Sequence, residues 1–191
     1  QTGYLIIVYD TFYEEIQPLV SWKETMGYEV TVTKTSQIPG GATKENIAAY
    51  IEDAYTTWLV PPAFVLFAGD VPQIPTWTGP ASGTASDLYY VTVTPGDYFP
   101  DIYRGRFPAA TEAQMSIMVE KTVDYDQGAL HSYEFLSKAA FLASDDMGGL
   151  AEQTHNYVIE NFLEPNGYTC DKIYQAYGGS TIDVITSLND G

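Results

Sequence analysis

The first third of the chain alternates between strand and helix patterns of apolar residues. Residues 4–9 form a continuous apolar, β-branched run, which is typical of a strand buried on both faces. Apolar side chains then recur at helical spacing over residues 12–22, with Pro18 as a break or kink and Asp10 as a cap. Residues 28–33 alternate between apolar and polar side chains, as in a half-buried strand. The pattern therefore predicts a strand, a helix and a second strand.

The next segment repeats this order. A second helix is predicted after Thr43, which can cap it, and residues 64–68 form a further apolar strand. Two strand-helix-strand units in succession favour right-handed crossovers and a parallel sheet. Residues 88–94 and 102–107 are predicted as two more strands, and a helix begins at Thr111.

The pattern restarts after Gly128 and predicts a second α/β unit. Its expected parts are a strand at 138–143, an acidic turn at 144–149, a helix through Leu163, a strand at 170–176 and a helix capped by Thr181. Two such strands cannot close a core by themselves, so this unit should pack on the first unit or on chain that is absent here. We expect an α/β fold with a parallel sheet flanked by helices, in a complete amino-terminal subdomain at 1–127 and a truncated second subdomain at 128–191.

Charge and composition narrow the function classes. Eight Lys and Arg stand against 25 Asp and Glu among 191 residues, a formal net charge of −17. Such a chain repels polyanions, which argues against nucleic acid or an anionic membrane surface as a partner. Cys170 is the single cysteine, so an internal disulfide framework is excluded. No apolar stretch approaches the length of a membrane span.

Three aspartates are candidate ligands for a hard cation. Asp70 follows an apolar run and Gly69, at the carboxyl end of a predicted buried strand, where α/β sheets place ligand groups. Asp97 and Asp101 lie on either side of Pro100, which places them on a loop. Calcium takes about six to eight oxygens from carboxylates and irregular backbone, and such a loop near Asp70 offers both. The alternative interpretation is that these are solvated turn residues.

Two other sets of residues are weaker candidates for a functional site. Cys170 with His155 or His131 could form a nucleophilic pair. However, His155 shares an apolar helix face, Cys170 begins a buried strand where burial raises a thiol's pKa, and His131 is expected to be exposed in a linker. Asp10 and Asp70 at strand ends would suit a receiver-like phosphoacceptor domain. Receiver folds pair acidic residues after the first strand, whereas Asp10 stands alone.

A series of short motifs runs across essentially the whole chain. They are Tyr4-Leu5-Ile6-Ile7, Pro18-Leu19-Val20-Ser21-Trp22-Lys23, Gly69-Asp70 with Ile74-Pro75, Ser86-Asp87-Leu88-Tyr89-Tyr90, Asp97-Tyr98-Phe99-Pro100-Asp101 and Gly105-Arg106-Phe107-Pro108. In their order and spacing these motifs resemble the gingipain family of secreted bacterial cysteine peptidases. The resemblance implies a caspase-like catalytic region made of the two subdomains, which acts on protein or peptide substrates and is secreted or held at the cell surface.

The resemblance also implies a calcium site in the first subdomain. The carboxylates of Asp70, Asp97 and Asp101 would be ligands, and backbone carbonyls near Thr94 and Phe99 would complete the shell. The alternative to a peptidase is a non-catalytic, calcium-stabilised extracellular module that uses the same fold for adhesion or secretion.

In peptidases of this kind a Cys thiolate attacks the scissile carbonyl, and a His in a Gly-His-Gly turn moves the proton. This chain contains no His-Gly dipeptide, so we expect a fragment that is inactive by itself and needs the remainder of the catalytic domain. The resemblance implies that Asp146, or its neighbour Asp145, is a candidate for the carboxylate that orients the catalytic His; the alternative is a residue of the loop turn with no such role. Glu152 falls where some relatives carry an acidic residue for a basic P1 side chain. The turn before Glu152 is shorter than theirs, so no Arg or Lys specificity is inferred.

Overall fold

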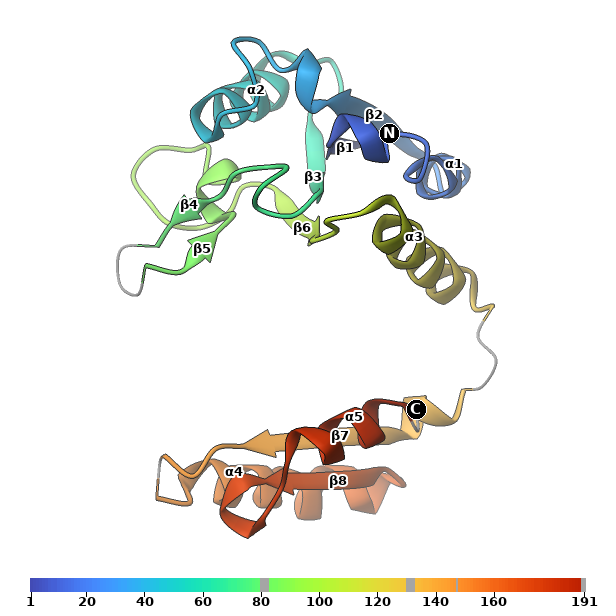
Figure 1. Cartoon of the computed structure of the whole chain (residues 1–191), viewed down its shortest axis with the longest axis vertical. Helices are drawn as coiled ribbons and strands as arrows, with labels where there is room; N and C mark the ends of the chain where they lie inside the picture. The colour runs from blue at the N-terminus through green and yellow to red at the C-terminus, as the bar shows by residue number, and fades with distance from the viewer. Residues whose placement is uncertain (80–82, 130–132, 147, 190–191) are drawn as a thin grey trace. The chain divides into compact units, whose positions relative to one another are not determined.

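The structure, a computed structural model, describes residues 1–79, 83–129, 133–146 and 148–189 (Figure 1). The chain forms two compact units, Gln1–Ala129 and Leu130–Gly191. The boundary between them lies two residues after the one expected from the sequence, at 129 rather than 127.

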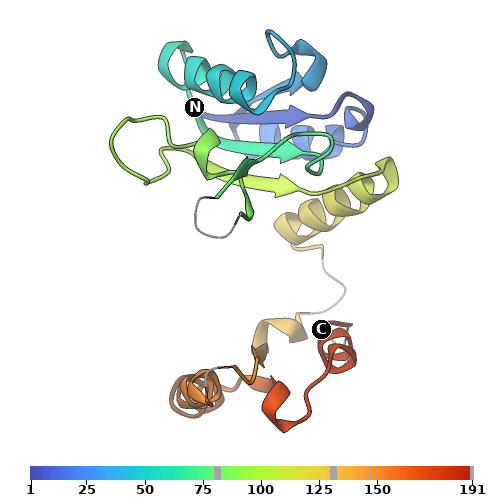
Figure 2. The same ribbon diagram turned by 60° about the vertical axis from the view of Figure 1, so that its left-hand side comes forward.

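The first unit is built on a four-stranded parallel sheet. Its strands are β1 (Thr2–Val8), β2 (Tyr28–Lys34), β3 (Pro62–Ala68) and β6 (Tyr103–Phe107), in the order β2-β1-β3-β6. The arrows of β1, β3 and β6 point the same way in Figure 2. The register pairs Val8 with Ala68 and Ala68 with Phe107, so the carboxyl ends of these strands meet at one edge. The parallel α/β sheet expected from the sequence is confirmed.

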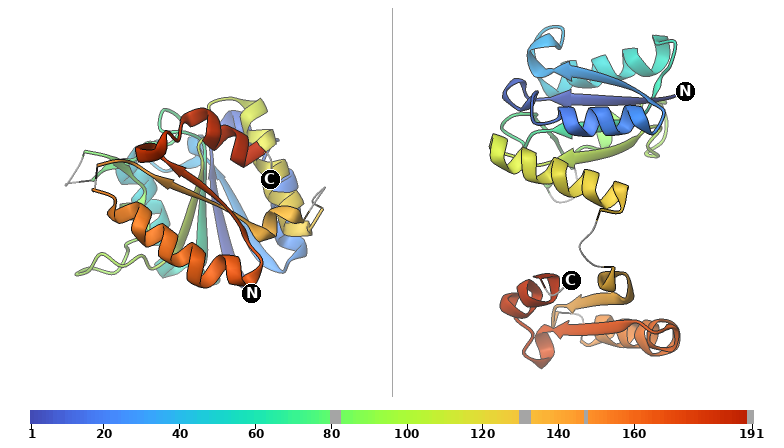
Figure 3. Two further views of the ribbon diagram at one scale, coloured as in Figure 1. Left: turned by 90° about the horizontal axis from the view of Figure 1, so that it is seen from below. Right: turned by 90° about the vertical axis from the view of Figure 1, so that its right-hand side faces the viewer.

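Helices cover both faces of this sheet. They are α1 (Gln17–Thr25), α2 (Lys44–Thr57) and α3 (Glu112–Gln127). The helix α2 lies on one face, and α1 and α3 lie on the other (Figure 3). Leu5 and Ile7 of β1 pack in the layer under α2, whereas Ile6 and Val8 pack in the opposite layer under α1 and α3. All four side chains are fully buried, which is why this strand is a continuous apolar run rather than an alternating one.

Two helix starts are those predicted. The hydroxyl of Thr43 accepts a hydrogen bond from the backbone N–H of Asn46 (3.2 Å) at the start of α2. The hydroxyl of Thr111 accepts one from the N–H of Gln114 (3.3 Å) at the start of α3. Each cap satisfies one of the N–H groups that a helix start leaves without an intrahelical partner.

The start of α1 differs from the expectation. Asp10 does not cap it, because its carboxylate accepts hydrogen bonds from the hydroxyl of Thr35 (2.7 Å) and the N–H of Ser36 (2.9 Å). Asp10 therefore joins the segments that follow β1 and β2. Pro18 does not kink the helix, since it lies in the first turn of α1, where a missing N–H removes no intrahelical hydrogen bond.

The segment at 88–94 is not the predicted strand. It begins as a 3-10 helix, η3 (Leu88–Tyr90), after a short antiparallel ribbon of β4 (Trp77–Thr78) and β5 (Ala85–Ser86). Tyr90 and Val91 are both buried in the layer under α2, and the ring centroids of Tyr90 and Phe67 are 4.9 Å apart. Two neighbouring side chains in one layer cannot come from a strand, whose side chains alternate between faces.

The described residues of the second unit contain a two-stranded parallel sheet and two α-helices. Its elements are β7 (Lys138–Ala143), α4 (Leu150–Val158), which continues as a π-helical turn (Ile159–Leu163), β8 (Thr169–Tyr174) and α5 (Thr181–Asn189). Ser180 rather than Thr181 caps α5, because the Ser180 hydroxyl accepts from the N–H of Asp183 (3.4 Å) while the Asp183 carboxylate accepts from the N–H of Ser180 (2.8 Å). In the described part of the chain, no helix is long and apolar enough to cross a membrane.

Arg106 ties together the loops at the carboxyl edge of the first sheet. From the end of β6, its Nε and Nη2 each donate to a carboxylate oxygen of Asp87 at 2.8 Å. Its Nη1 donates to the carbonyl oxygens of Gly69 (2.6 Å) and Ile74 (3.1 Å). The guanidinium also lies over the ring of Phe67. The side chains of Arg106 and Asp87 are only 12% and 16% exposed. This set of contacts uses the planar, multi-donor geometry of Arg.

We expect Arg106→Lys to destabilise the chain by about 2 kcal/mol, because an ammonium keeps the charge but cannot reproduce all of these hydrogen bonds. Urea unfolding measures the loss. Arg104→Lys is the matched control, since Arg104 lies on the same strand and is exposed; it should change the free energy of unfolding by less than about 0.5 kcal/mol. Equal losses in the two variants would contradict this role of Arg106.

Candidate functional site

Asp70 lies at the carboxyl end of β3 and opens a tight turn. Its N–H donates to the carbonyl oxygen of Ala109 (3.0 Å), and its own carbonyl accepts from the N–H groups of Gln73 (3.0 Å) and Ile74 (2.9 Å). One carboxylate oxygen accepts from the N–H of Val71 (2.8 Å). The side chain of Asp70 is therefore held against the turn that it begins.

The carboxylate of Asp101 closes the loop that precedes it. It accepts hydrogen bonds from the N–H of Val93 (2.7 Å) and from the N–H and hydroxyl of Thr94 (2.8 Å each). The N–H of Asp101 donates to the carbonyl oxygen of Val91 (2.8 Å). The hydrogen bond from the Thr94 N–H, followed by that from the Thr94 hydroxyl, lowers the pKa of Asp101. This carboxylate is thus already bound to the loop itself.

The expected calcium ligands do not form one cluster. Asp97 lies in the exposed part of the loop, where its Oδ1 accepts from the N–H of Phe99 (3.0 Å), and Phe99 and Thr94 are exposed as well. Among the described residues, no three His, Cys, Asp or Glu side chains are grouped so that they could hold a metal ion. The carboxylates of Asp70, Asp97 and Asp101 are therefore not gathered around one point in this arrangement. Calcium binding stays a prediction.

Glu152 is the carboxylate with the most unusual surroundings. It lies in the first turn of α4, beyond the carboxyl end of β7, and is 2% exposed. Within the described residues, neither of its carboxylate oxygens has a hydrogen-bond partner. Such groups are rare, because a buried carboxylate without partners loses its hydration with no compensation. The positive end of the α4 dipole favours the charge but provides no hydrogen bond to either oxygen.

Asp146 lies on the turn between β7 and α4. It is exposed, and its Oδ1 accepts a hydrogen bond from the hydroxyl of Ser144 (2.6 Å). Its neighbour Asp145 is exposed too. Both follow the same strand as Glu152, so all three acidic residues singled out by the resemblance in the second subdomain lie beyond the carboxyl end of β7. This is the edge at which α/β sheets bind ligands.

His155 lies one turn after Glu152 on α4 and packs among aromatic rings. Its ring centroid is 5.1 Å from that of Phe141 and 5.9 Å from that of Tyr174, and its buried Nδ1 has no hydrogen-bond partner among the residues that the structure describes. The hydroxyl of Tyr174 donates to Oδ1 of Asn156 (3.2 Å). Burial raises the pKa of Tyr174, and the charge of Glu152 adds to the effect. No pattern in the sequence indicates that Tyr174 lies close to these two α4 residues.

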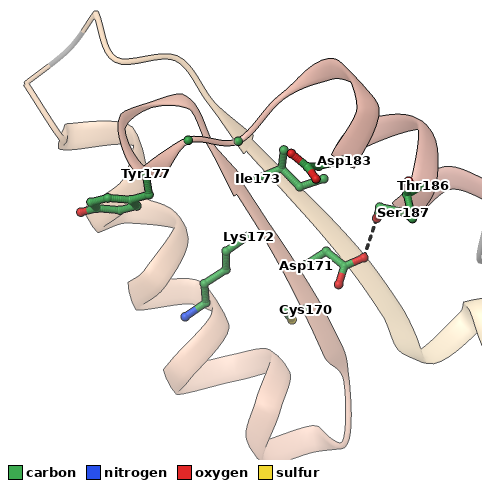
Figure 4. A pocket seen from close by; sticks show the side chains of 10 residues that line it. Cys170, Asp171, Lys172, Ile173, Tyr177, Asp183, Thr186 and Ser187 are labelled. Atoms are coloured by element: carbon green, nitrogen blue, oxygen red, sulfur yellow. Dashed lines mark hydrogen bonds between the residues drawn. The ribbon is translucent and has the colours of Figure 1, made fainter.

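Cys170 has the properties of a structural thiol. It lies near the start of β8, and burial, with the charge of Glu164 as the next cause, raises the pKa of the thiol. It lines a hollow of about 650 Å³ in which Asp171 accepts a hydrogen bond from the hydroxyl of Ser187 on α5 (Figure 4). His131, the other His considered as its partner, lies outside the described residues.

Both the sequence and the fold are similar to those of known peptidases. The model of peptidase family C25 matches residues 1–191. Lys-gingipain from Porphyromonas gingivalis is 28% identical over an alignment of 172 residues that covers 86% of this chain and 10% of that protein. Gingipain R2 from the same organism is 26% identical over an alignment that covers 100% of this chain and 26% of that protein. A solved complex of the Porphyromonas gingivalis RgpB pro- and mature domains matches with a TM-score of 0.85 at 25% identity, over 99% of this chain and 45% of that one. The chain thus spans only a part of each of these proteins.

Asp101→Asn should loosen the loop at 91–101, because a neutral amide is a weaker acceptor for the N–H groups of Val93 and Thr94. We expect faster amide hydrogen exchange at these two residues and a melting temperature lower by about 2 °C. Since the pKa of Asp101 is lowered in the folded state, its stabilising effect is present at neutral pH and is lost as the pH falls through that lowered pKa. The difference between wild type and variant should therefore vanish in acid.

Adding a chelator distinguishes the hydrogen-bonding role of Asp101 in its loop from a role in calcium binding. If calcium binds, wild-type protein should melt at a higher temperature with calcium than with excess chelator, and Asp101→Asn should remove the shift. An unchanged melting temperature of the wild type would reject the calcium site and leave the hydrogen-bonded loop as the role of Asp101.

Glu152→Gln should stabilise the chain by about 1 kcal/mol, because it removes a buried charge that has no partner while keeping the side-chain shape. Urea unfolding at neutral pH measures the gain. Glu160→Gln, on an exposed position of the same helical segment, should have an effect below about 0.5 kcal/mol. A loss of stability in Glu152→Gln would mean that the carboxylate makes a structural contact.

Proposed function

The chain belongs to peptidase family C25, and from this premise we propose that it is part of a secreted, gingipain-like cysteine endopeptidase. In this proposal its residues bind the substrate and orient the catalytic His, while the catalytic thiol and imidazole come from the remainder of the catalytic domain. The chain is then inactive by itself. Family membership favours this function over a non-catalytic module for adhesion or secretion.

The buried carboxylate of Glu152 is the observation that supports this function most directly. It is 2% exposed and both of its oxygens lack partners among the described residues. A guanidinium or ammonium group would supply the missing hydrogen bonds and the opposite charge. We therefore assign Glu152 to binding a basic side chain of the substrate, at the edge where an α/β sheet presents its ligand groups.

Peptide hydrolysis by a cysteine peptidase begins when a thiolate attacks the carbonyl carbon, and an imidazole passes the proton to the leaving amine. Cys170 and His155 are unsuited to these roles, since the pKa of the thiol is raised and the imidazole packs against aromatic rings. We assign Asp146 the role of accepting a hydrogen bond from the catalytic imidazole and so holding its orientation. Its exposed position leaves it accessible to a residue from the rest of the domain.

The test uses the full-length parent protein and peptide substrates with Lys, Arg or Leu at P1. Glu152→Gln should lower kcat/KM for the Lys and Arg substrates by at least about 30-fold, the effect of removing one member of a desolvated charge pair. Its effect on the Leu substrate should be much smaller.

Glu160→Gln is the control in the same assay and should leave all three rates unchanged. Hydrolysis should require a thiol and should be absent when the chain is tested alone. Equal losses for the Lys, Arg and Leu substrates would refute the role of Glu152, and a parent without thiol-dependent hydrolysis would refute the peptidase itself.

A further inference from the structure

A groove lies between α1 and α3 in the first unit. Its volume is about 380 Å³, and its apolar lining comes from Pro18 of α1 and from Val119 and Val123 of α3. The two valines are four residues apart and so lie on the same side of the helix. Val119 is 2% exposed and belongs to the hydrophobic core under the two helices, so the floor of the groove is continuous with that core.

Carboxylates surround this apolar floor. Glu120 and Asp124 lie four residues apart on α3, in line with Ser116, and Glu15 contributes from the segment just before α1. Oε2 of Glu15 is buried and has no hydrogen-bond partner in the described part of the chain. Among the described residues that line the groove there is no Lys or Arg. The groove thus combines an apolar surface with negative charges that have no counter-ion inside it.

We propose that this groove binds a Lys- or Arg-bearing segment of a partner polypeptide. The methylene groups of a long basic side chain would lie on Pro18, Val119 and Val123, and its cationic end would reach the carboxylates. A hydrated metal ion would gain nothing from the apolar floor, which is why the geometry favours a side chain with an aliphatic stem. The net charge of −17 would further attract a basic partner from a distance. This groove is in the other unit from Glu152, so the inference does not rest on the proposed function.

Fluorescence anisotropy of the chain with a fluorescein-labelled peptide of alternating Lys and Leu tests the proposal. A peptide with Glu in place of Lys should not bind. The double variant Glu120→Gln, Asp124→Asn should raise Kd about fivefold, as expected for the loss of two partly exposed ion pairs. Ser116→Phe, which places a ring against the groove, should weaken binding without changing the charge.

The matched control is the double variant Glu52→Gln, Asp53→Asn on α2. It removes the same charge from two exposed positions outside the groove, and its Kd should stay within about twofold of the wild type. Equal weakening by both double variants would show a general attraction to an acidic protein and would overturn the proposal. So would unchanged binding to Ser116→Phe, or complete displacement of the peptide by an equal concentration of magnesium ion, which has no aliphatic stem.

Discussion

The carboxyl edge of the first sheet depends on the partly buried ion pair between Arg106 and Asp87. Both charges are largely removed from water, so the pair can persist only if the remaining donors of the guanidinium are satisfied too. The carbonyl oxygens of Gly69 and Ile74 accept hydrogen bonds from Nη1. The pair therefore connects the end of β3, the turn that begins at Asp70 and the segment that leads into η3. Loop backbone has no strand ladder to hold it, and an edge that carries functional loops needs such an anchor.

At the carboxyl edge of the sheet in the second unit, by contrast, the buried polar groups lack partners among the described residues. Glu152 is buried, yet no described cation pairs with it, and the buried Nδ1 of His155 one turn later also lacks a partner. Both groups reduce the stability of the folded chain, since each loses water without a replacement. A ligand that pairs with the carboxylate would recover this free energy on binding. α/β sheets bind ligands at the carboxyl ends of their strands. A destabilising buried group at such a position is typical of a functional residue.

Local sequence patterns correctly predict the helices and strands that depend on neighbouring residues. They fail for segments whose structure is decided by tertiary contacts. The apolar run at 4–9 and the cap at Thr43 depend on near neighbours, and both indicate the correct element. The segment at 88–94 looks like a strand because its aromatic and β-branched residues are common in strands. It is not one, because Tyr90 and its neighbour fill the same layer of the core. The position of Asp10 suggests a helix cap, but its hydroxyl partner lies 25 residues further along the chain.

The candidate site is harder to predict than the fold because its acidic residues look alike in the sequence. Asp87 pairs with Arg106, Asp101 accepts three hydrogen bonds from its own loop, and Glu152 has no described partner. Composition and spacing cannot separate these outcomes, since only the fold decides which donors reach each carboxylate. The number of hydrogen bonds that each carboxylate already accepts is a better guide to ligand binding than its place in a motif. By that measure Asp101 has little capacity left for a metal ion, whereas neither oxygen of Glu152 accepts a hydrogen bond from a described residue.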